Sequence, residues 1–168
     1  MQKKLESLAD FFNKELNFYK NLLSYSREKN KNLVEKNLEE ISIITQKEEK
    51  LVSKIKETEV RRVELLKEIA KETKLEFGNL NMTKVAELSD DPKIKKQIIE
   101  TKDSLSDILE ELRKINDMNT ELIKQSLEII NQTIKMMGNT AANPQLYNKN
   151  KQDHISKNQQ SFLFDKKF

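Results

Sequence analysis

The sequence predicts an all-α protein: an elongated antiparallel helical hairpin or three-helix bundle, similar to a coiled coil, with a flexible C-terminal tail. Its 168 residues include only two glycines and two prolines, so turns are few and helices are long. Charged residues make up 35% of the chain and hydrophobic residues 36%. That balance suits the narrow seams between long helices. Apolar residues also recur at the spacing of a helix face.

The first two helices are predicted at about 3–35 and 38–72. In the first, apolar residues recur three or four positions apart from Leu5 to Leu23, and Leu33 and Val34 follow later, which is the spacing of one helix face. The second helix keeps a sevenfold apolar register that also contains polar residues. These residues are Glu48, Thr58 and Arg62. Polar seam residues fix register and partner choice, although a seam open to water on one side explains the same pattern.

The stretch 73–91 is predicted to be a loop that carries one short helix at about 82–88, whose apolar residues cap one end of the bundle. A third long helix follows at about 92–137. Asp91 is suited to accept the free N–H groups at the start of this helix. Pro92 occupies the first helical position, where its missing N–H costs nothing.

The helical domain is therefore predicted to span 1–137 and a flexible basic tail to span 138–168. Gly138 is a natural helix terminator, and the residues behind it are too polar to fold alone. Five lysines and two aspartates in the tail account for the net charge of +3, which leaves the body neutral. The tail nevertheless ends in an apolar cluster. Its members are Phe162, Leu163, Phe164 and Phe168.

In the second half of the third long helix, the apolar surface divides in two. One stripe continues the sevenfold line of Ile115 through Leu122, Ile129 and Met136. The second stripe consists of Ile123, Leu127, Ile130, Ile134 and Met137, and the polar residues between the stripes are Asn119, Ser126 and Thr133. A helix that is apolar on two sides must cover both. It either packs against two neighbours in the bundle or offers the second stripe as a groove wall for a partner helix.

The residues needed for catalysis are missing, so we expect neither an enzyme nor a cofactor. The only histidine is His154 in the tail, there is no cysteine, and there is no glycine-rich phosphate loop. We expect no nucleic-acid binding, because the basic excess belongs to the tail and forms no stripe on the body. No apolar run approaches the length of a membrane span, so we expect no membrane insertion and a cytoplasmic location.

Several short motifs follow one another along nearly the whole chain. They are ELNFYKNLL at 15–23, QKEEKL at 46–51, EVRR at 59–62, LL at 65–66, NDMNTELI at 116–123, YN at 147–148 and DKK at 165–167. In their order and spacing the chain resembles the FlgN family of flagellar type III export chaperones. The resemblance implies a cytoplasmic chaperone that binds the C-terminal helical segments of hook-associated (hook–filament junction) proteins. Such a chaperone prevents premature assembly and delivers its clients to the export gate and its ATPase components.

The resemblance also implies that clients bind to the C-terminal part of the chain, where the second stripe lies. The predicted client-binding residues are Asn116, Asn119, Leu122, Ile123, Leu127, Ile130, Ile134 and Met137. The predicted accessory residues of the tail are Tyr147, Phe162, Leu163, Phe164 and Asp165. We expect a monomer or a weak homodimer. The alternative is a structural coiled-coil adaptor or tether with no export role, for which a strict heptad and a stable oligomer are typical.

Overall fold

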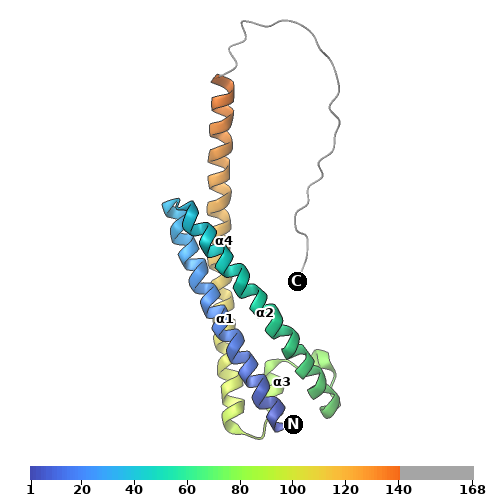
Figure 1. Ribbon diagram of the computed structural model, residues 1–168. Helices are drawn as coiled ribbons and strands as arrows, with labels where there is room; N and C mark the ends of the chain where they lie inside the picture. The colour runs from blue at the N-terminus through green and yellow to red at the C-terminus, as the bar shows by residue number, and fades with distance from the viewer. Residues whose placement is uncertain (141–168) are drawn as a thin grey trace, which may run out of the picture. The chain divides into compact units, whose positions relative to one another are not determined.

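The computed structural model describes residues 1–140, and this part of the chain consists of helices and short turns (Figure 1). The elements are α1 (Gln2–Glu35), α2 (Leu38–Thr73), the 3₁₀ turn η1 (Phe77–Asn79), α3 (Met82–Glu87) and α4 (Pro92–Thr140). Residues 1–140 contain no strand, so the all-α, bundle-like fold class is confirmed. The chain divides into two units, Met1–Ile130 and Asn131–Phe168.

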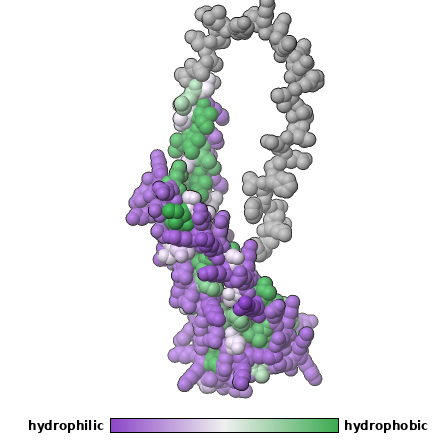
Figure 2. Space-filling view, viewed as in Figure 1, coloured by the Kyte–Doolittle hydropathy of each residue, from purple (hydrophilic) through white to green (hydrophobic). Residues whose placement is uncertain are grey.

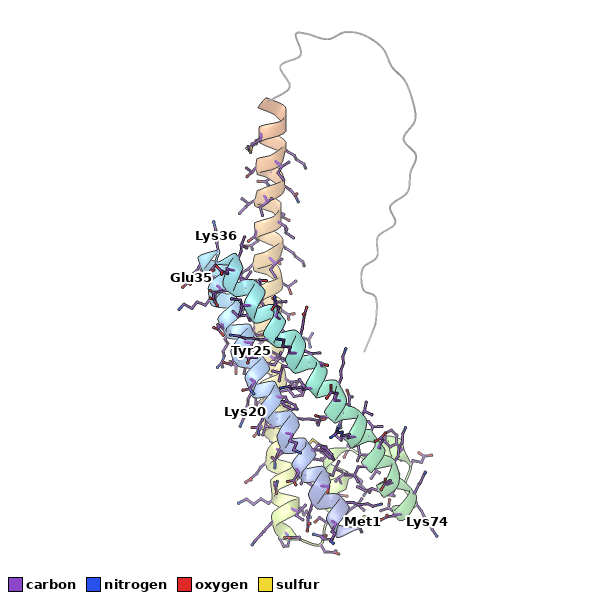
Figure 3. The ribbon with its side chains drawn as sticks, in the orientation of Figure 1. Met1, Lys20, Tyr25, Glu35, Lys36 and Lys74 are labelled. Atoms are coloured by element: carbon purple, nitrogen blue, oxygen red, sulfur yellow. The ribbon has the colours of Figure 1, made fainter. Side chains whose placement is uncertain are left out.

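Helices α1 and α2 form an antiparallel hairpin. At one end the Nζ of Lys4 lies 2.6 Å from Oε1 of Glu72. Toward the other end Lys29 of α1 pairs with Glu48 of α2. In Figure 3 the labelled residues Met1 and Lys74 lie at the first end, and Glu35 and Lys36 lie at the turn. The start of α1 therefore packs beside the end of α2.

A two-residue turn joins the two helices. Lys36 adopts the left-handed conformation with φ 59°, which closes a helix C-terminus. The N–H of Asn37 then donates to the carbonyl of Asn32 at 2.9 Å, as in a Schellman motif. Oδ1 of Asn37 accepts the N–H of Glu40 at 3.3 Å, so Asn37 also caps α2. The turn therefore satisfies backbone groups of both helices.

Helix α4 packs beside α1 and runs parallel to it. Near the start of both helices, the hydroxyl of Thr101 donates to Oδ1 of Asn13 at 2.9 Å. Further along both, the amide of Asn30 donates to Oδ1 of Asn119 at 2.8 Å. These two bonds set the register of the two helices.

The ends of α4 differ in how well local signals predict them. Oδ1 of Asp91 accepts the N–H of Lys93 at 2.8 Å, so the predicted cap at the start is confirmed. The prediction that Gly138 ends the helix near residue 137 is wrong, because α4 continues to Thr140. A glycine inside a helix costs only about 1 kcal/mol, and no glycine among residues 1–140 has a positive φ.

The main apolar core lies where α1 starts, α2 ends and α4 starts. Buried side chains from α3 and the loop before it complete this core, so the prediction that the short helix caps one end of the bundle is confirmed. The core consists of Leu5, Leu8, Ala9, Phe12, Leu66, Ile69, Ala70, Leu80, Val85, Ala86, Ile94 and Ile98.

Candidate functional site

A buried polar layer joins α1 to α4 beyond the apolar core. The Ser26 hydroxyl donates to Oδ1 of Asn116 at 2.7 Å, and the Asn119 amide donates to the Ser26 carbonyl at 2.9 Å. Ser26 and Asn119 are almost fully buried. Both asparagines are predicted client-binding residues, and the structure places them in the contact between α1 and α4. Their contribution there is register, because each hydrogen bond requires one alignment of the two helices.

The same layer reaches α2 through Glu48. This carboxylate pairs with the Lys29 ammonium, and its Oε1 lies 3.4 Å from the Ser26 hydroxyl. A hydroxyl has one proton and donates to one acceptor at a time, and Asn116 is the nearer of the two. Three helices therefore meet in a polar cluster rather than an apolar seam. Glu48 is one of the polar residues that the sevenfold register places at the seam, and its function as a register residue follows from these contacts.

A second polar contact lies nearer the apolar core, between Glu15 and Arg62. Nε of Arg62 lies 2.9 Å from Oε1 of Glu15, but its N–H is not aligned to form a hydrogen bond. Burial raises the pKa of Glu15, and the charge of Glu59 raises it further, while Arg62 acts in the opposite direction. Burial likewise raises the pKa of Tyr19. The hydroxyl of the third polar seam residue, Thr58, donates to the carbonyl of Lys54 in its own helix.

The buried Glu15 was not singled out from the sequence, although a signal was available. Leu8, Phe12, Glu15 and Ser26 all fall at three- or four-residue spacings on the buried face of α1. Polar residues inside such an apolar series indicate buried partners on a facing helix. The charged partners are not identifiable without the register between α1 and α2.

The apolar face of α4 becomes exposed immediately after Asn119. At 3.6 residues per turn, Leu112, Ile123 and Ile130 lie within about 20° of one another around the helix. Leu112 is buried, whereas Ile123, Leu127 and Ile130 are 41%, 54% and 52% exposed. Figure 2 shows apolar surface on α4 next to the hairpin turn. The exposed face is therefore a continuation of the face that packs in the bundle, and α1 no longer covers it.

This arrangement corrects the interpretation of the two stripes. The sevenfold line through Ile115 and Leu122 was predicted as the first of the two stripes. Along this line Ile115 and Leu122 are half-buried and Ile129 is exposed, so the line leaves the bundle after Leu122. The reason is the end of α1 at Glu35, beyond which α1 no longer covers α4. Asn119 was placed between the stripes, but it lies in the packed face.

The remaining predicted residues lie in the second unit. Its described part is the end of α4, on which Ile134 and Met137 are exposed. The predicted residues of the tail lie outside the described residues: they are Tyr147, Phe162, Leu163, Phe164 and Asp165. Within the described residues, no helix is both long and apolar enough to cross a membrane, and no three His, Cys, Asp or Glu side chains cluster as metal ligands.

Comparison with known proteins decides the family. The family model described as FlgN protein matches residues 1–155. This chain belongs to the FlgN family. The FlgN family is one of flagellar export chaperones, so a general chaperone function in flagellar export follows, and the family is not one of enzymes. No curated protein and no solved structure gives a significant match.

Proposed function

We propose that this FlgN-family chain is a cytoplasmic chaperone that binds the C-terminal helical segments of hook-associated proteins on the exposed face of α4. Binding prevents premature assembly, and the chaperone delivers its clients to the flagellar type III export gate and its ATPase components. We further propose that it acts as a monomer or weak homodimer and requires no cofactor.

One observation carries this proposal: the packed face of α4 continues without a covering helix at Ile123, Leu127 and Ile130. These residues are about half exposed, on a helix whose preceding turns are covered by α1. An exposed apolar helix face is stabilised when another helix packs on it, and a client helix supplies an apolar stripe of matching spacing. Sequestering that stripe prevents the client from using it for assembly.

The energy available from these three side chains is modest. Complete burial of an aliphatic side chain contributes about 1.5–3 kcal/mol, so three half-exposed ones contribute roughly 2–4 kcal/mol. A micromolar complex requires about 8 kcal/mol, and binding also costs ordering entropy. Further contacts are therefore required. We propose that Ile134 and Met137 on the same helix, and the predicted residues of the tail, supply part of them.

The test is Ile130→Asp in the full chain, with Gln125→Asp as the matched control on the same exposed stretch of helix. Titration calorimetry with a purified hook-associated protein measures the affinity, and circular dichroism measures the helix content. We expect Ile130→Asp to keep its helix content and lose at least tenfold in affinity, about 1.4 kcal/mol. Equal binding by both variants contradicts the assignment of the site.

The alternative function, a structural coiled-coil adaptor or tether, predicts a stable homo-oligomer. Against it, the segment 74–91 with its short helix α3 interrupts the long helices, and α4 leaves apolar side chains exposed after Asn119. Sedimentation equilibrium distinguishes the two functions. A monomer or weak dimer at micromolar concentration supports the chaperone, and a tight oligomer without client binding supports the tether.

A further inference from the structure

The turn of the α1–α2 hairpin carries two strongly exposed aliphatic side chains. Val34 is 65% exposed and Leu38 is 78% exposed. They lie on either side of the Lys36–Asn37 turn, whose backbone groups are bonded to both helices. The exposed side chains therefore sit on an ordered turn. Single exposed apolar residues are ordinary on a protein surface, so the significance of these two depends on what lies beside them.

This hairpin tip lies beside the exposed face of α4. The hydrogen bond from Asn30 to Asn119 aligns α1 with α4, and the two helices run in the same direction. One turn further along each helix, at equal rise per residue, Val34 reaches the level of Ile123. Figure 3 shows the labelled residues Glu35 and Lys36 at the tip, close to the course of α4. All of these residues belong to the first unit.

We propose that the hairpin tip and the exposed face of α4 form one docking site for an amphipathic helix. The helix lies along α4 at Ile123, Leu127 and Ile130, in the line that α1 occupies further back, and its end abuts Val34 and Leu38. This inference rests on the proposed function and identifies a second wall of the client site, on an element far from α4 in sequence.

The occupant is an apolar-faced client helix because the docking face continues an existing helix–helix interface. Helix α1 covers the face of α4 at Leu112 and Asn119, and Ile130 continues the same face, so a helix in the orientation of α1 fits there. The charges next to the exposed stretch have both signs, Lys124 and Glu128. They favour neither a strongly acidic nor a strongly basic partner, so recognition depends on apolar contact and is weakly salt-dependent.

The second wall also adds binding free energy to the α4 face, whose three side chains alone do not supply enough for a micromolar complex. Val34 and Leu38 are each more exposed than any of the three α4 residues of the first unit. Covering them adds apolar burial in proportion to that exposure. The end of the client helix is thereby fixed as well, so the wall sets the client's position along α4.

Affinity measurements test the second wall. We compare Val34→Asp and Leu38→Asp with Val60→Asp, a control on α2 whose side chain is 59% exposed. The probe is a synthetic peptide of the C-terminal helix of a hook-associated protein, titrated into the full chain by calorimetry. We expect the tip variants to bind roughly tenfold more weakly and Val60→Asp to bind like the wild type. Should aspartate disturb the turn, Leu38→Ala serves as the milder variant, with affinity reduced in the same direction.

A labelling experiment tests contact directly. The chain contains no cysteine, so Leu38→Cys and Val60→Cys each accept a single fluorophore. Two versions of the peptide are used, one with a quencher at its N-terminus and one with a quencher at its C-terminus. We expect only one of the two to quench the fluorophore at position 38, and neither to quench the fluorophore at position 60. No quenching at position 38 from either end overturns the second wall.

The outcomes separate this inference from the proposed function. If Ile130→Asp weakens binding but both tip variants bind like the wild type, the second wall is refuted and the chaperone site on α4 stands. If the wild type does not bind the peptide, both fail. If the wild type self-associates without peptide and Val34→Asp abolishes that association, the occupant is a second copy of this chain and the inference is overturned.

Discussion

The two halves of the α1–α2 hairpin hold the bundle together in different ways. Where α1 starts, the contacts are apolar and include the fully buried Phe12, Ile69 and Ile98. Toward the turn, buried apolar side chains such as Ile44 and Leu112 remain, but the contacts with α4 also include the hydrogen bonds of Ser26 and Asn119. Apolar burial supplies stability without directional preference, whereas hydrogen bonds supply alignment and little net stability. The apolar half therefore stabilises the fold, and the polar half aligns α4 where its exposed face begins.

The largest expected effect is in the apolar half. Phe12→Ala removes a fully buried ring from the core, and we expect unfolding to cost about 3–5 kcal/mol less. Urea denaturation followed by circular dichroism measures this loss. Phe77→Ala is the matched control, because its ring is exposed. Similar losses for the two variants contradict the location of the core.

An intermediate effect is expected in the polar half. Asn119→Ala leaves the Ser26 carbonyl and the Asn30 amide without their bonds to α4, and we expect a loss of roughly 1–3 kcal/mol. Asp117→Ala, at an exposed position two residues away, is the control. A loss as large as that of Phe12→Ala indicates that the two halves do not differ as described.

A pH titration tests the charged contact that lies between the halves. Burial and Glu59 raise the pKa of Glu15, so the folded chain retains a proton that the unfolded chain has released. Its contribution to stability is complete below the ordinary carboxyl pKa and falls as pH rises through the raised pKa. We expect the difference in unfolding free energy between wild type and Glu15→Gln to decline over that range. A difference that rises with pH instead shows that Arg62 dominates the titration.

The smallest effect is expected at exposed ion pairs. Nζ of Lys114 lies 2.6 Å from Oε1 of Glu110 on the surface of α4, where water screens the charges. We expect Lys114→Ala to leave the urea midpoint unchanged within error. A clear shift indicates that exposed ion pairs, as well as the buried polar layer, contribute to the stability of the fold.

The fold class and the start of α4 were predictable because their signals are local. The cap at Asp91 and the apolar spacing of α1 need no knowledge of the rest of the chain. Sevenfold counting from Ile98 reaches the buried Leu105, Leu112 and Asn119, but it does not show where the covering helix α1 ends. Nor did the sequence show that Asn116 and Asn119 contact α1, since their acceptor and donor groups lie about 90 positions away.

The exposed stretch of α4 was predicted as a stripe, but its cause was not. It is exposed because α1 ends at Glu35, level with the turn of α4 that follows Asn119. Whether two helices end at the same level depends on their register, which is a property of the packed structure. The hairpin tip went unnoticed for the same reason: Val34 and Leu38 have the composition of core residues, and only their position at the turn leaves them exposed.

The two-residue turn at Lys36 and Asn37 sets the length of the hairpin, and that length has a consequence for protein engineering. Inserting about 11 residues, three helical turns, into both α1 and α2 extends the hairpin by roughly 16 Å. The longer hairpin then covers Ile123, Leu127 and Ile130 from within the same molecule. We expect a chain lengthened in this way to be a more stable, closed bundle whose α4 face cannot bind a client helix. The length of the α1–α2 hairpin is therefore a design parameter for blocking the proposed site.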